Sequence, residues 1–422
     1  MIPTNRAVFI LSAVRTPIGK YGGSLRDLTA PDLGVIAARA ALDRAGIAAE
    51  EIDAAIFGHA RQAGNGPNPA RQIAVRSGIP HRVPACTVNM ACASGLQAIV
   101  LGYQEILLGN AETVLVGGVE SMSRVPYLVE GARWGARIGH QELVDGMYRD
   151  GFLCPLAKLV MGETAELLAE QYHITREEQD AYALASQQRA RRALESGRLA
   201  EEIVPVTVKD KKGERTFALD EHPRFETTAG SLAKLPPVFT QSGRTGTITA
   251  GNSSGITDGA AALVLASEER MIRLRRAGRA QPIGPDGPEG PDGPDGNEPL
   301  ARIVEATAAG VDPRMMGIGP VPAVQKLLAK TGRRLDDYDL VELNEAFAAQ
   351  VLACDRELRF DRERLNVNGG AIALGHPIGC SGARIVATLL HEMRRRKARR
   401  GLATLCVSGG LGMCLDIESL SH

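Results

Sequence analysis

One pattern that occurs twice limits the possible folds of this chain more than any other feature of its sequence. Each copy consists of a Ser-Gly pair, an expected helix, an apolar strand and a Gly-Gly pair, and the copies lie at residues 94–118 and 381–410. Strands separated by helices of 10–15 residues are typical of α/β folds. The sequence therefore predicts an α/β protein with two similar halves, one toward each end of the chain.

The segments around the two copies continue this alternation. We expect strands over residues 7–14, 52–58, 113–116 and 403–407, and helices over residues 31–45, 94–108 and 383–396. The helix over 31–45 has proline and aspartate at its start and Gly46 after its end, which are common boundary residues. In the repeated pattern we interpret the Ser-Gly pairs as helix starts and the Gly-Gly pairs as strand ends.

The middle of the chain has a different character and predicts an inserted domain. Residues 122–250 contain an expected charged helix over 165–196, a basic hairpin near 209–215 and an irregular loop over 220–228. We divide the chain into a first half (1–121 with 251–278), a loop domain (122–250) and a second half (279–422). Within the second half, four Pro-Asp/Glu-Gly triplets predict a solvated, flexible insertion at 284–298.

The charge balance excludes some function classes. The chain has 49 Lys plus Arg and 49 Asp plus Glu, so its formal net charge is zero and gives no electrostatic basis for binding nucleic acid. The basic run over 394–400 closes an expected helix, where cations suit the helix dipole and water. We therefore expect no nucleic-acid partner.

Apolar runs and cysteine usage indicate a location. No apolar run approaches the roughly 20 residues that span a bilayer, and the first residues lack the basic-then-apolar pattern of a signal segment. The seven cysteines and eight histidines show no disulfide or metal-ligand spacing. We expect a cytoplasmic protein with free thiols, no membrane association and no metal site.

Cys92 is the first candidate for chemistry. It lies just before the expected helix over 94–108, with small neighbours, Ala91, Ala93 and Gly95, that leave its sulfur accessible. The field of a helix N-terminus stabilises a thiolate, so we expect a lowered pKa. A buried structural cysteine is the alternative for this segment taken alone.

Three further residues are candidates to complete a catalytic site around Cys92. His376 stands between Gly375 and Pro377 on a tight loop, a setting that suits a general base, although the same histidine in another role would merely brace the loop. Cys406 lies where an apolar strand runs into a glycine-rich turn, which suits a second acid/base. Asn344 offers a side-chain donor for an oxyanion, or alternatively a helix cap.

Together these segments resemble the thiolase family, whose members make or cleave carbon–carbon bonds in 3-ketoacyl-CoA thioesters. The resemblance covers nearly the whole chain, and its motifs stand at residues 15–19 (RTPIG), 88–95 (VNMACASG), 249–255 (TAGNSSG), 344–347 (NEAF), 375–379 (GHPIG) and 406–410 (CVSGG). It implies the thiolase fold, in which two similar α/β halves form a five-layer α-β-α-β-α core with an inserted loop domain.

The resemblance also implies a role for each motif residue. Cys92 would accept the acyl group in a ping-pong reaction, His376 would activate it, and Cys406 would move protons at the α-carbon of acetyl-CoA and at the CoA thiol. Asn344 and His376 would hold a water that stabilises the enolate oxygen. The backbone N–H groups of Cys92 and Ser408 would form a second oxyanion hole.

For coenzyme A the resemblance implies contacts from the loop domain and the strand ends. Coenzyme A and acetyl-CoA would be substrates, with no permanently bound cofactor, and the protein would be a homodimer or homotetramer. The implied CoA contacts are Met161, Arg224, Ser231, Phe239, Ala250, Ser254 and Phe347. Taken alone, Arg224 is equally suited to a surface ion pair with Asp220 or Glu226, and Ser254 to a turn or helix cap.

Two positions depart from the family pattern. Ser408 stands where the family usually has glycine, so its N–H can serve the second oxyanion hole only if serine adopts the required backbone angles. Val160 precedes Met161 where thiolases of the acetoacetyl-CoA type have a histidine, which favours a broader 3-ketoacyl-CoA substrate. The sequence does not indicate the acyl chain length or the direction of the reaction.

Two other functions compete with a thiolase. Residues 251–255 satisfy the G-x-S-x-G pattern of a serine hydrolase with Ser253 as nucleophile, which requires a strand over 247–250, but Cys92 and Cys406 would then have no role. A non-catalytic acyl-CoA-binding or lipid-binding relative is expected to lack one of the three catalytic residues. All three are present, so an acyltransferase is the interpretation that the sequence favours.

Overall fold

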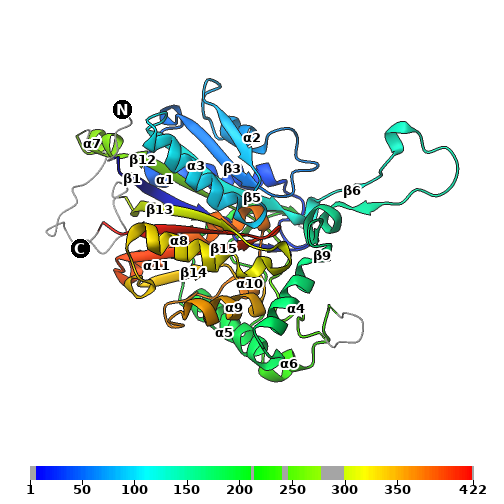
Figure 1. The fold of residues 1–422 in the computed structure, drawn as a ribbon. Coiled ribbons are helices and arrows are strands. Elements are labelled where there is room, and N and C mark those ends of the chain that lie inside the picture. Colours follow the sequence, from blue (N-terminus) through cyan, green and yellow to red (C-terminus); the bar gives the residue numbers. More distant parts are fainter. Residues whose placement is uncertain (1–5, 211–212, 240–245, 277–298, 421–422) are drawn as a thin grey trace.

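A computed structural model describes residues 6–210, 213–239, 246–276 and 299–420, and a ten-stranded sheet runs through its centre (Figure 1). The strand order is β14 (Leu340–Leu343), β15 (Arg400–Val407), β16 (Leu411–Glu418), β13 (Ala301–Gly310), β1 (Val8–Arg15), β12 (Thr257–Ser267), β5 (Thr113–Ser121), β3 (Ala54–His59) and β4 (Ala85–Val88), and β2 (Gly19–Lys20) pairs with β12. The predicted insertion at 284–298 lies outside the described residues.

The sheet consists of two parts that share one junction. In the first part, β12 lies between β1 and β5 and pairs with both in the antiparallel sense, while β3 is parallel to β5 and to β4. In the second part, β14 is parallel to β15, and β16 lies antiparallel between β15 and β13. The parts meet where Val8–Ile10 of β1 pairs with Ala301–Ile303 of β13. Each part of the sheet thus contains both parallel and antiparallel strand pairs.

Helices cover both parts and complete five layers. The outer helices α1 (Ala30–Ala45) and α2 (Pro69–Arg76) pack on the first part, and α8 (Pro320–Thr331) packs on β13 and β16. Between the parts lie α3 (Ser94–Leu107) and α11 (Ile378–Arg396), which contact each other; α3 packs on strands of the first part, and α11 packs on strands of both. The α-β-α-β-α order is the one that the sequence resemblance implies, and the two central helices share one apolar core with both halves of the sheet.

Local sequence explains why α1 has the bounds that the sequence predicts. The Thr29 side chain accepts a hydrogen bond from the Asp32 N–H, and the Asp32 carboxylate accepts one from the Thr29 N–H at 2.9 Å. Pro31 fits the first turn, and Gly46 ends the helix in the left-handed conformation with φ 60°. Each terminus is therefore specified by residues adjacent to it.

The predicted role of the Ser-Gly and Gly-Gly pairs as boundaries is wrong at two of their four places, whereas Ser94 begins α3 as predicted. Gly117 and Gly118 lie inside β5, and α11 begins at Ile378, so that Gly382 lies within the helix. A Cβ on Gly382 would lie 2.5 Å from the Leu96 nitrogen, and one on Gly95 would lie 2.8 Å from the Ala383 nitrogen. These glycines bring α3 and α11 into close contact, and only the pair at 409–410 follows its strand as predicted.

The inserted segment contains two helices where the sequence predicts one. They are α4 (Met161–Gln171) and α5 (Arg176–Glu195), separated by His173, which has φ 50°, and by Thr175, whose side chain caps α5. The predicted hairpin is present as β10 (Val206–Asp210) and β11 (Gly213–Phe217). The α-helices and strands not yet named are α6 (Ala229–Ala233), α7 (Glu268–Arg276), α9 (Ala348–Leu358), α10 (Ala371–Leu374), β6 (Tyr127–Leu128), β7 (Val144–Asp145), β8 (Leu153–Cys154) and β9 (Leu159–Val160).

One buried side chain joins the inserted segment to the first half. Arg15, at the end of β1, donates from Nε to Glu202 at 2.6 Å and from both Nη atoms to Asp220 at 2.7 and 2.9 Å. All three side chains are buried, and the single guanidinium pairs with both carboxylates where water cannot reach them. Among the described residues, no helix is long and apolar enough to cross a membrane.

Candidate active site

Cys92 lies on a single turn of 3₁₀ helix, η2 (Ala91–Ala93), directly before α3. Ala91 has φ 45°, a left-handed conformation that is uncommon for a residue with a side chain. Two side chains hold this turn: the Asn89 Oδ1 atom accepts from the Ala91 N–H at 2.9 Å, and the Ser94 hydroxyl donates to the Ala91 carbonyl at 2.7 Å. The turn packs against both β15 and α11, which places Cys92 beside the second half of the molecule.

The predicted lowering of the Cys92 pKa is wrong. Burial raises the pKa of the thiol, because it disfavours the charged thiolate, and this outweighs the groups that favour it. Those groups are the Arg61 guanidinium and the backbone N–H groups of Ser408 and Cys92, which hydrogen bond to the sulfur. The cysteine therefore rests as a neutral thiol, with hydrogen-bond donors already directed at it.

His376 occupies a buried loop between α10 and α11, where Gly375 has φ 101°. Its Nδ1 atom lies 2.6 Å from the Ser381 hydroxyl oxygen, and that hydroxyl donates to the Pro377 carbonyl at 3.0 Å. With the hydroxyl hydrogen used in this way, we assign the imidazole proton to Nδ1, which donates it to Ser381. The Nε2 atom is then left with its lone pair.

The environment of His376 suits a base that remains neutral at rest. Its Nε2 atom is buried and has no hydrogen-bond partner among the described residues. Burial, together with the Arg384 guanidinium, lowers the pKa of His376 to about 3. The alternative that His376 only braces its loop is weakened, because its bracing bond uses Nδ1 and leaves Nε2 free for chemistry.

Asn344 follows β14 and carries an amide without partners. The N-cap of α9 is Phe347, so the helix-cap alternative for Asn344 is wrong. Its side chain is buried, and neither Oδ1 nor Nδ2 has a hydrogen-bond partner among the described residues. A buried amide in this state is costly unless another group binds it, which marks Asn344 as a ligand-directed side chain.

Cys406 lies near the end of β15 and is fully enclosed. Burial raises the pKa of its thiol well above the usual value, and the neighbouring thiols of Cys92 and Cys354 add to this effect. It belongs to a small apolar cluster with Met316 and Ala346. Cys406 therefore remains protonated near neutral pH, as an acid requires.

Backbone hydrogen bonds join the separate loops of the site. The loop at 252–255 connects two of them: the Ser254 N–H donates to the Ala346 carbonyl at 3.0 Å, and the His376 N–H donates to the Gly255 carbonyl at 2.9 Å. The loop that follows Asn344 and the loop that carries His376 are thus attached to the same segment. Cys92 and Ser408 meet through the hydrogen bond to the sulfur.

Serine at position 408 is compatible with its backbone. Among the described residues, the left-handed conformations in this turn belong to Gly409 and Gly410, with φ 91° and 86°, and Ser408 has no positive φ. The strained geometry that would require glycine falls on the two glycines that follow. The substitution leaves the Ser408 N–H directed at Cys92.

The residues predicted to contact coenzyme A fall into two groups. Met161 and Phe347 pack against the cluster that contains Cys406, and the Phe239 ring covers Gly162 at the start of α4. The other group lies farther out, with Arg224, Ser231 and Ala250 exposed and Ser254 half-buried. The structure thus brings Met161 and Phe347 to the predicted acid/base cysteine, while the exposed residues lie on the surface of the inserted segment and of the 250–254 turn.

The alternatives for individual CoA residues have clear outcomes. Within the described residues the Arg224 guanidinium forms no ion pair with Asp220, whose two carboxylate oxygens bind Arg15, and none with Glu226. The Ser231 hydroxyl caps α6 by donating to the Thr228 carbonyl at 2.8 Å. That bond engages the hydroxyl within the helix cap.

The serine-hydrolase alternative does not fit the geometry. Residues 247–250 do not form a strand, and the Ser253 hydroxyl donates to the Thr249 carbonyl at 2.7 Å. His376 uses Nδ1 for Ser381 rather than for Ser253. The elbow that this chemistry requires is therefore absent from the segment.

Two charged residues beside the site were missed by the sequence reasoning. Glu120, in β5, accepts hydrogen bonds from the N–H groups of Ala60, Arg61 and Gly379 at 3.2, 3.2 and 2.9 Å. Arg61 follows β3, and its guanidinium affects the pKa of Cys92. A glutamate inside an otherwise apolar strand was the available signal for Glu120, whereas nothing in the sequence singles out Arg61.

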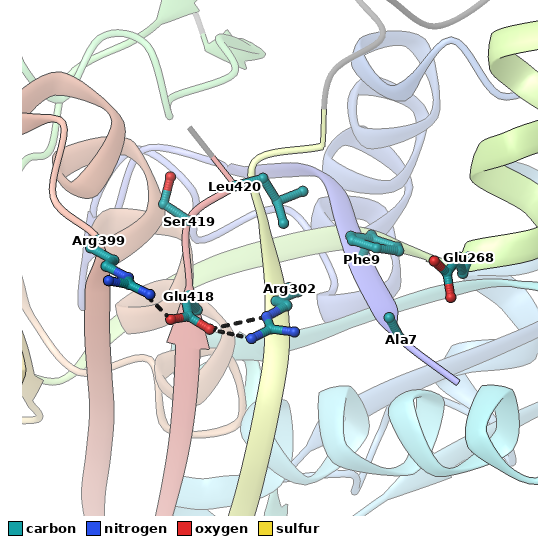
Figure 2. A pocket seen from close by; sticks show the side chains of 8 residues that line it. All are labelled: Ala7, Phe9, Glu268, Arg302, Arg399, Glu418, Ser419 and Leu420. Carbon is teal, nitrogen blue, oxygen red and sulfur yellow. Dashed lines mark hydrogen bonds and ion pairs between the residues drawn. The ribbon is translucent and has the colours of Figure 1, made fainter. Parts of the chain in front are cut away.

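A cavity far from these residues offers no second candidate. It has a volume of about 310 Å³ and is lined by Ala7, Phe9, Glu268, Arg302, Arg399, Glu418, Ser419 and Leu420 (Figure 2). Arg302 and Arg399 both pair with Glu418. Burial by itself would raise the pKa of Glu418, but these cations outweigh it and lower the pKa to about 2. Its strongest charges are satisfied within the chain, and none of the predicted site residues lines it.

The chain is similar to known proteins over nearly its whole length. The chain matches the family models for the N-terminal domain of thiolase over residues 8–269 and for the C-terminal domain of thiolase over residues 297–419. It is 49% identical to an acetyl-CoA acetyltransferase of Pseudomonas aeruginosa over 97% of this chain and 98% of that protein. It is 48% identical to one from Escherichia coli over 98% and 99% of the two chains.

Solved structures are similarly close. An acetyl-CoA acetyltransferase of Bacillus anthracis superimposes with a TM-score of 0.90 and 46% identity, covering 98% of this chain and 99% of the other. Human mitochondrial 3-ketoacyl-CoA thiolase in complex with CoA gives 0.89 and 44%, covering 98% of each chain. With both domain models matched and this identity over nearly the full length, the chain belongs to the thiolase family.

Proposed function

We propose that this acyltransferase performs the thiolase reaction through Cys92, with His376, Cys406 and Asn344 in the roles predicted from the sequence. The reaction is the reversible, CoA-dependent cleavage of a 3-ketoacyl-CoA to acetyl-CoA and a shortened acyl-CoA, and its reverse is a Claisen condensation. The observation that carries the proposal is the neutral pair of thiols with N–H groups directed at one of them. Together with the free Nε2 atom of His376, this arrangement provides a nucleophile, a base and an acid.

In the cleavage direction the first half-reaction moves two protons, one from Cys92 to His376 and one from Cys406 to carbon 2 of the substrate. The Nε2 atom of His376 takes the Cys92 proton as the sulfur attacks the 3-keto carbon of the substrate. The bond between carbons 2 and 3 breaks, its electron pair forms the enolate of acetyl-CoA, and the Cys406 thiol protonates carbon 2. Acetyl-CoA leaves, and the shortened acyl group remains on Cys92 as a thioester.

The second half-reaction returns both protons. The Cys406 thiolate takes the proton of the incoming CoA thiol, whose sulfur attacks the acyl group on Cys92. The Cys92 thiolate leaves and recovers its proton from His376, so atoms and charge balance over the cycle. This order of events requires that acetyl-CoA leaves before CoA binds, which is ping-pong behaviour.

Fixed donors stabilise the two negative charges that form. Asn344 and the protonated His376 would stabilise the enolate oxygen through a water, and the N–H groups of Cys92 and Ser408 would stabilise the oxyanion of acyl transfer. One good donor in such a site contributes about 3–4 kcal/mol to the transition state. The hydrogen bonds of the Ser408 and Cys92 N–H groups to the sulfur support the second assignment.

Coenzyme A would lie across the inserted segment and the strand ends. Met161, Phe239 and Phe347 would contact the pantetheine, since Met161 and Phe347 pack against the Cys406 cluster. Arg224 would stack on the adenine, and Ser231, Ala250 and Ser254 would line the rest of the path. The exposure of Arg224, with no partner for its guanidinium among the described residues, supports its assignment to a ligand.

The assembly and setting of the protein are part of the same proposal. We assign a homodimer or homotetramer, and β6 and β7 support this because they carry an arm that extends away from the body (Figure 1). Trp134 and Ile138 on this arm are 84% and 98% exposed, which is unfavourable unless another chain covers them. Light scattering of the purified protein tests the assignment.

The substrate range and location complete the proposal. Val160 favours 3-ketoacyl-CoA substrates longer than acetoacetyl-CoA, as in the β-oxidation of fatty acids, and the cysteine composition favours the cytoplasm. The division into a first half, a loop domain over 122–250 and a second half is likewise proposed. The position of β12 supports this division. β12 follows residues 122–250 in the chain, yet it lies between β1 and β5, which both precede them.

One experiment tests the catalytic proposal directly. Acetoacetyl-CoA and a medium-chain 3-ketoacyl-CoA are supplied with CoA, and their cleavage to acetyl-CoA is followed for the wild type, Cys92→Ala and Cys406→Ala. Peptide mass spectrometry locates the acyl group after substrate is added without CoA. Full activity in Cys92→Ala, or an acyl group on another residue, would refute the proposal.

A further inference from the structure

Arg61 is a buried cation without a partner. It follows β3, only 8% of its surface is exposed, and its Nε atom is buried with no hydrogen-bond partner among the described residues. Its guanidinium makes neither a hydrogen bond nor an ion pair within the part of the chain that the structure describes. A buried guanidinium usually has its donors satisfied, so this one requires an explanation.

The Arg61 side chain borders a cavity of about 300 Å³. The lining residues are Ala60, Arg61, Gln62, Ala63, Asn89, Val125, Gly146 and Asp150. Cys92 does not line the cavity, but it packs against the same apolar cluster as Ala60 and Val125, and the Arg61 charge acts on its thiol, so the cavity lies near the nucleophile. Most of its wall is apolar or already hydrogen-bonded, since Asn89 donates to the Ala60 carbonyl at 3.0 Å.

The neighbouring carboxylates are held by other groups. Asp150 accepts from the Nε and Nη2 atoms of Arg149 at 2.7 and 2.6 Å. Glu120 accepts from three backbone N–H groups and lies 3.1 Å from the His59 Nε2 atom. Both carboxylates act on Arg61 through space, but neither forms a hydrogen bond with it. Arg61 therefore keeps its donors for a group from outside the chain.

We propose that this cavity receives the far end of the acyl group that Cys92 carries, and that Arg61 binds a carboxylate there. The inference rests on the proposed function and adds a substrate class to it: 3-ketoacyl-CoA thioesters whose acyl chain ends in a carboxylate. The chemistry at carbons 2 and 3 is unchanged, because the distant carboxylate takes no part in bond breaking. A planar carboxylate suits the paired donors of a guanidinium, and charge-assisted hydrogen bonds are the strongest available to it.

The test compares substrates that differ only at the far end. Values of kcat/KM are measured for 3-oxoadipyl-CoA against 3-oxohexanoyl-CoA, and for 3-oxosuberyl-CoA against 3-oxooctanoyl-CoA, because the length that fits is set by the cavity. We expect the wild type to prefer the carboxylate member of at least one pair by about tenfold or more. In Arg61→Met this ratio should fall to about one, and Arg61→Lys should retain part of it.

The ratio isolates binding of the carboxylate from other effects. If Arg61 served only to tune the Cys92 thiol, Arg61→Met would slow both members of a pair equally and leave the ratio unchanged, which would overturn the inference. Arg133→Met, on the exposed arm and not among the residues that line the cavity, is the matched control and should keep the wild-type ratio.

Failure of the inference is distinguishable from failure of the proposed function. A wild type that cleaves 3-oxohexanoyl-CoA or acetoacetyl-CoA but shows no preference in either pair would overturn the inference and leave the thiolase reaction intact. No cleavage of any of these substrates would instead refute the proposed function. Circular dichroism and a thermal midpoint confirm that each variant is folded.

Discussion

Replacing Asn344 with leucine should separate activity from stability. Both amide atoms of this buried side chain lack partners among the described residues, so the folded chain carries the desolvation cost of the amide without a protein hydrogen bond in return. Such a cost is about 1–3 kcal/mol. Leucine has a similar volume and no polar atoms, so Asn344→Leu should raise the free energy of unfolding by an amount within this range.

The same substitution should remove most of the catalysis. If the Asn344 amide helps to bind the water that stabilises the enolate oxygen, its loss corresponds to the loss of one oxyanion donor. That loss is about 3–4 kcal/mol in the transition state, or roughly a hundredfold to a thousandfold in kcat. KM for the 3-ketoacyl-CoA should change little, since the charge develops only as the carbon–carbon bond breaks.

Two measurements on one preparation decide whether Asn344 serves catalysis or stability. Urea denaturation gives the unfolding free energy at an unchanged m-value, and steady-state cleavage of acetoacetyl-CoA gives kcat. Asn344→Asp, which keeps the size but not the donors, is the companion variant and should be equally slow. If Asn344→Leu is destabilised by several kcal/mol, or retains wild-type kcat, then Asn344 is a structural residue and the reasoning fails.

Three further predictions concern other residues of the site and of the fold. Because burial raises the pKa of Cys92, its alkylation by iodoacetamide should accelerate about tenfold per pH unit from pH 6 to at least pH 9; a plateau below pH 7, read by peptide mass spectrometry, would contradict this. Arg15→Met leaves Glu202 and Asp220 buried without their cation and should destabilise the fold by about 3–5 kcal/mol in urea denaturation; an unchanged midpoint would argue against the buried ion pairs. Ser408→Ala and Ser408→Gly should keep kcat within about threefold, because the backbone N–H and not the hydroxyl faces the sulfur; a large loss would assign a role to the hydroxyl.

The sequence was sufficient for features that depend on neighbours in the chain. The capping residues of α1, the turn that precedes α3 and the tight loop at His376 are all specified by residues within a few positions of one another. Pattern reasoning therefore placed Cys92, His376 and Cys406 at the ends of the correct elements. It failed where a pattern had two physical meanings, as for Gly382, which allows close helix contact and does not start a helix.

Features that depend on distant partners were not accessible in the same way. Glu120 acts by accepting from Gly379, which lies 259 positions away in the chain, and no local pattern connects the two. The sign of the Cys92 pKa shift failed for a related reason. The helix N-terminus is visible in the sequence, but the burial that outweighs it arises from β15 and α11 packing over the turn.

The opposed pKa shifts of Cys92 and His376 have a consequence for the order of events in catalysis. Burial raises the thiol pKa and lowers the imidazole pKa, so the proton stays on sulfur in the resting enzyme. An ion pair is disfavoured there because both charges would be desolvated.

Once the sulfur attacks a carbonyl, the negative charge moves to an oxygen that the Cys92 and Ser408 N–H groups can bind, and the imidazolium retains its Nδ1 bond to Ser381. The dry environment that disfavours the free thiolate strengthens those hydrogen bonds. Proton transfer should therefore accompany attack rather than precede it, which keeps the nucleophile unreactive until a substrate carbonyl is in place.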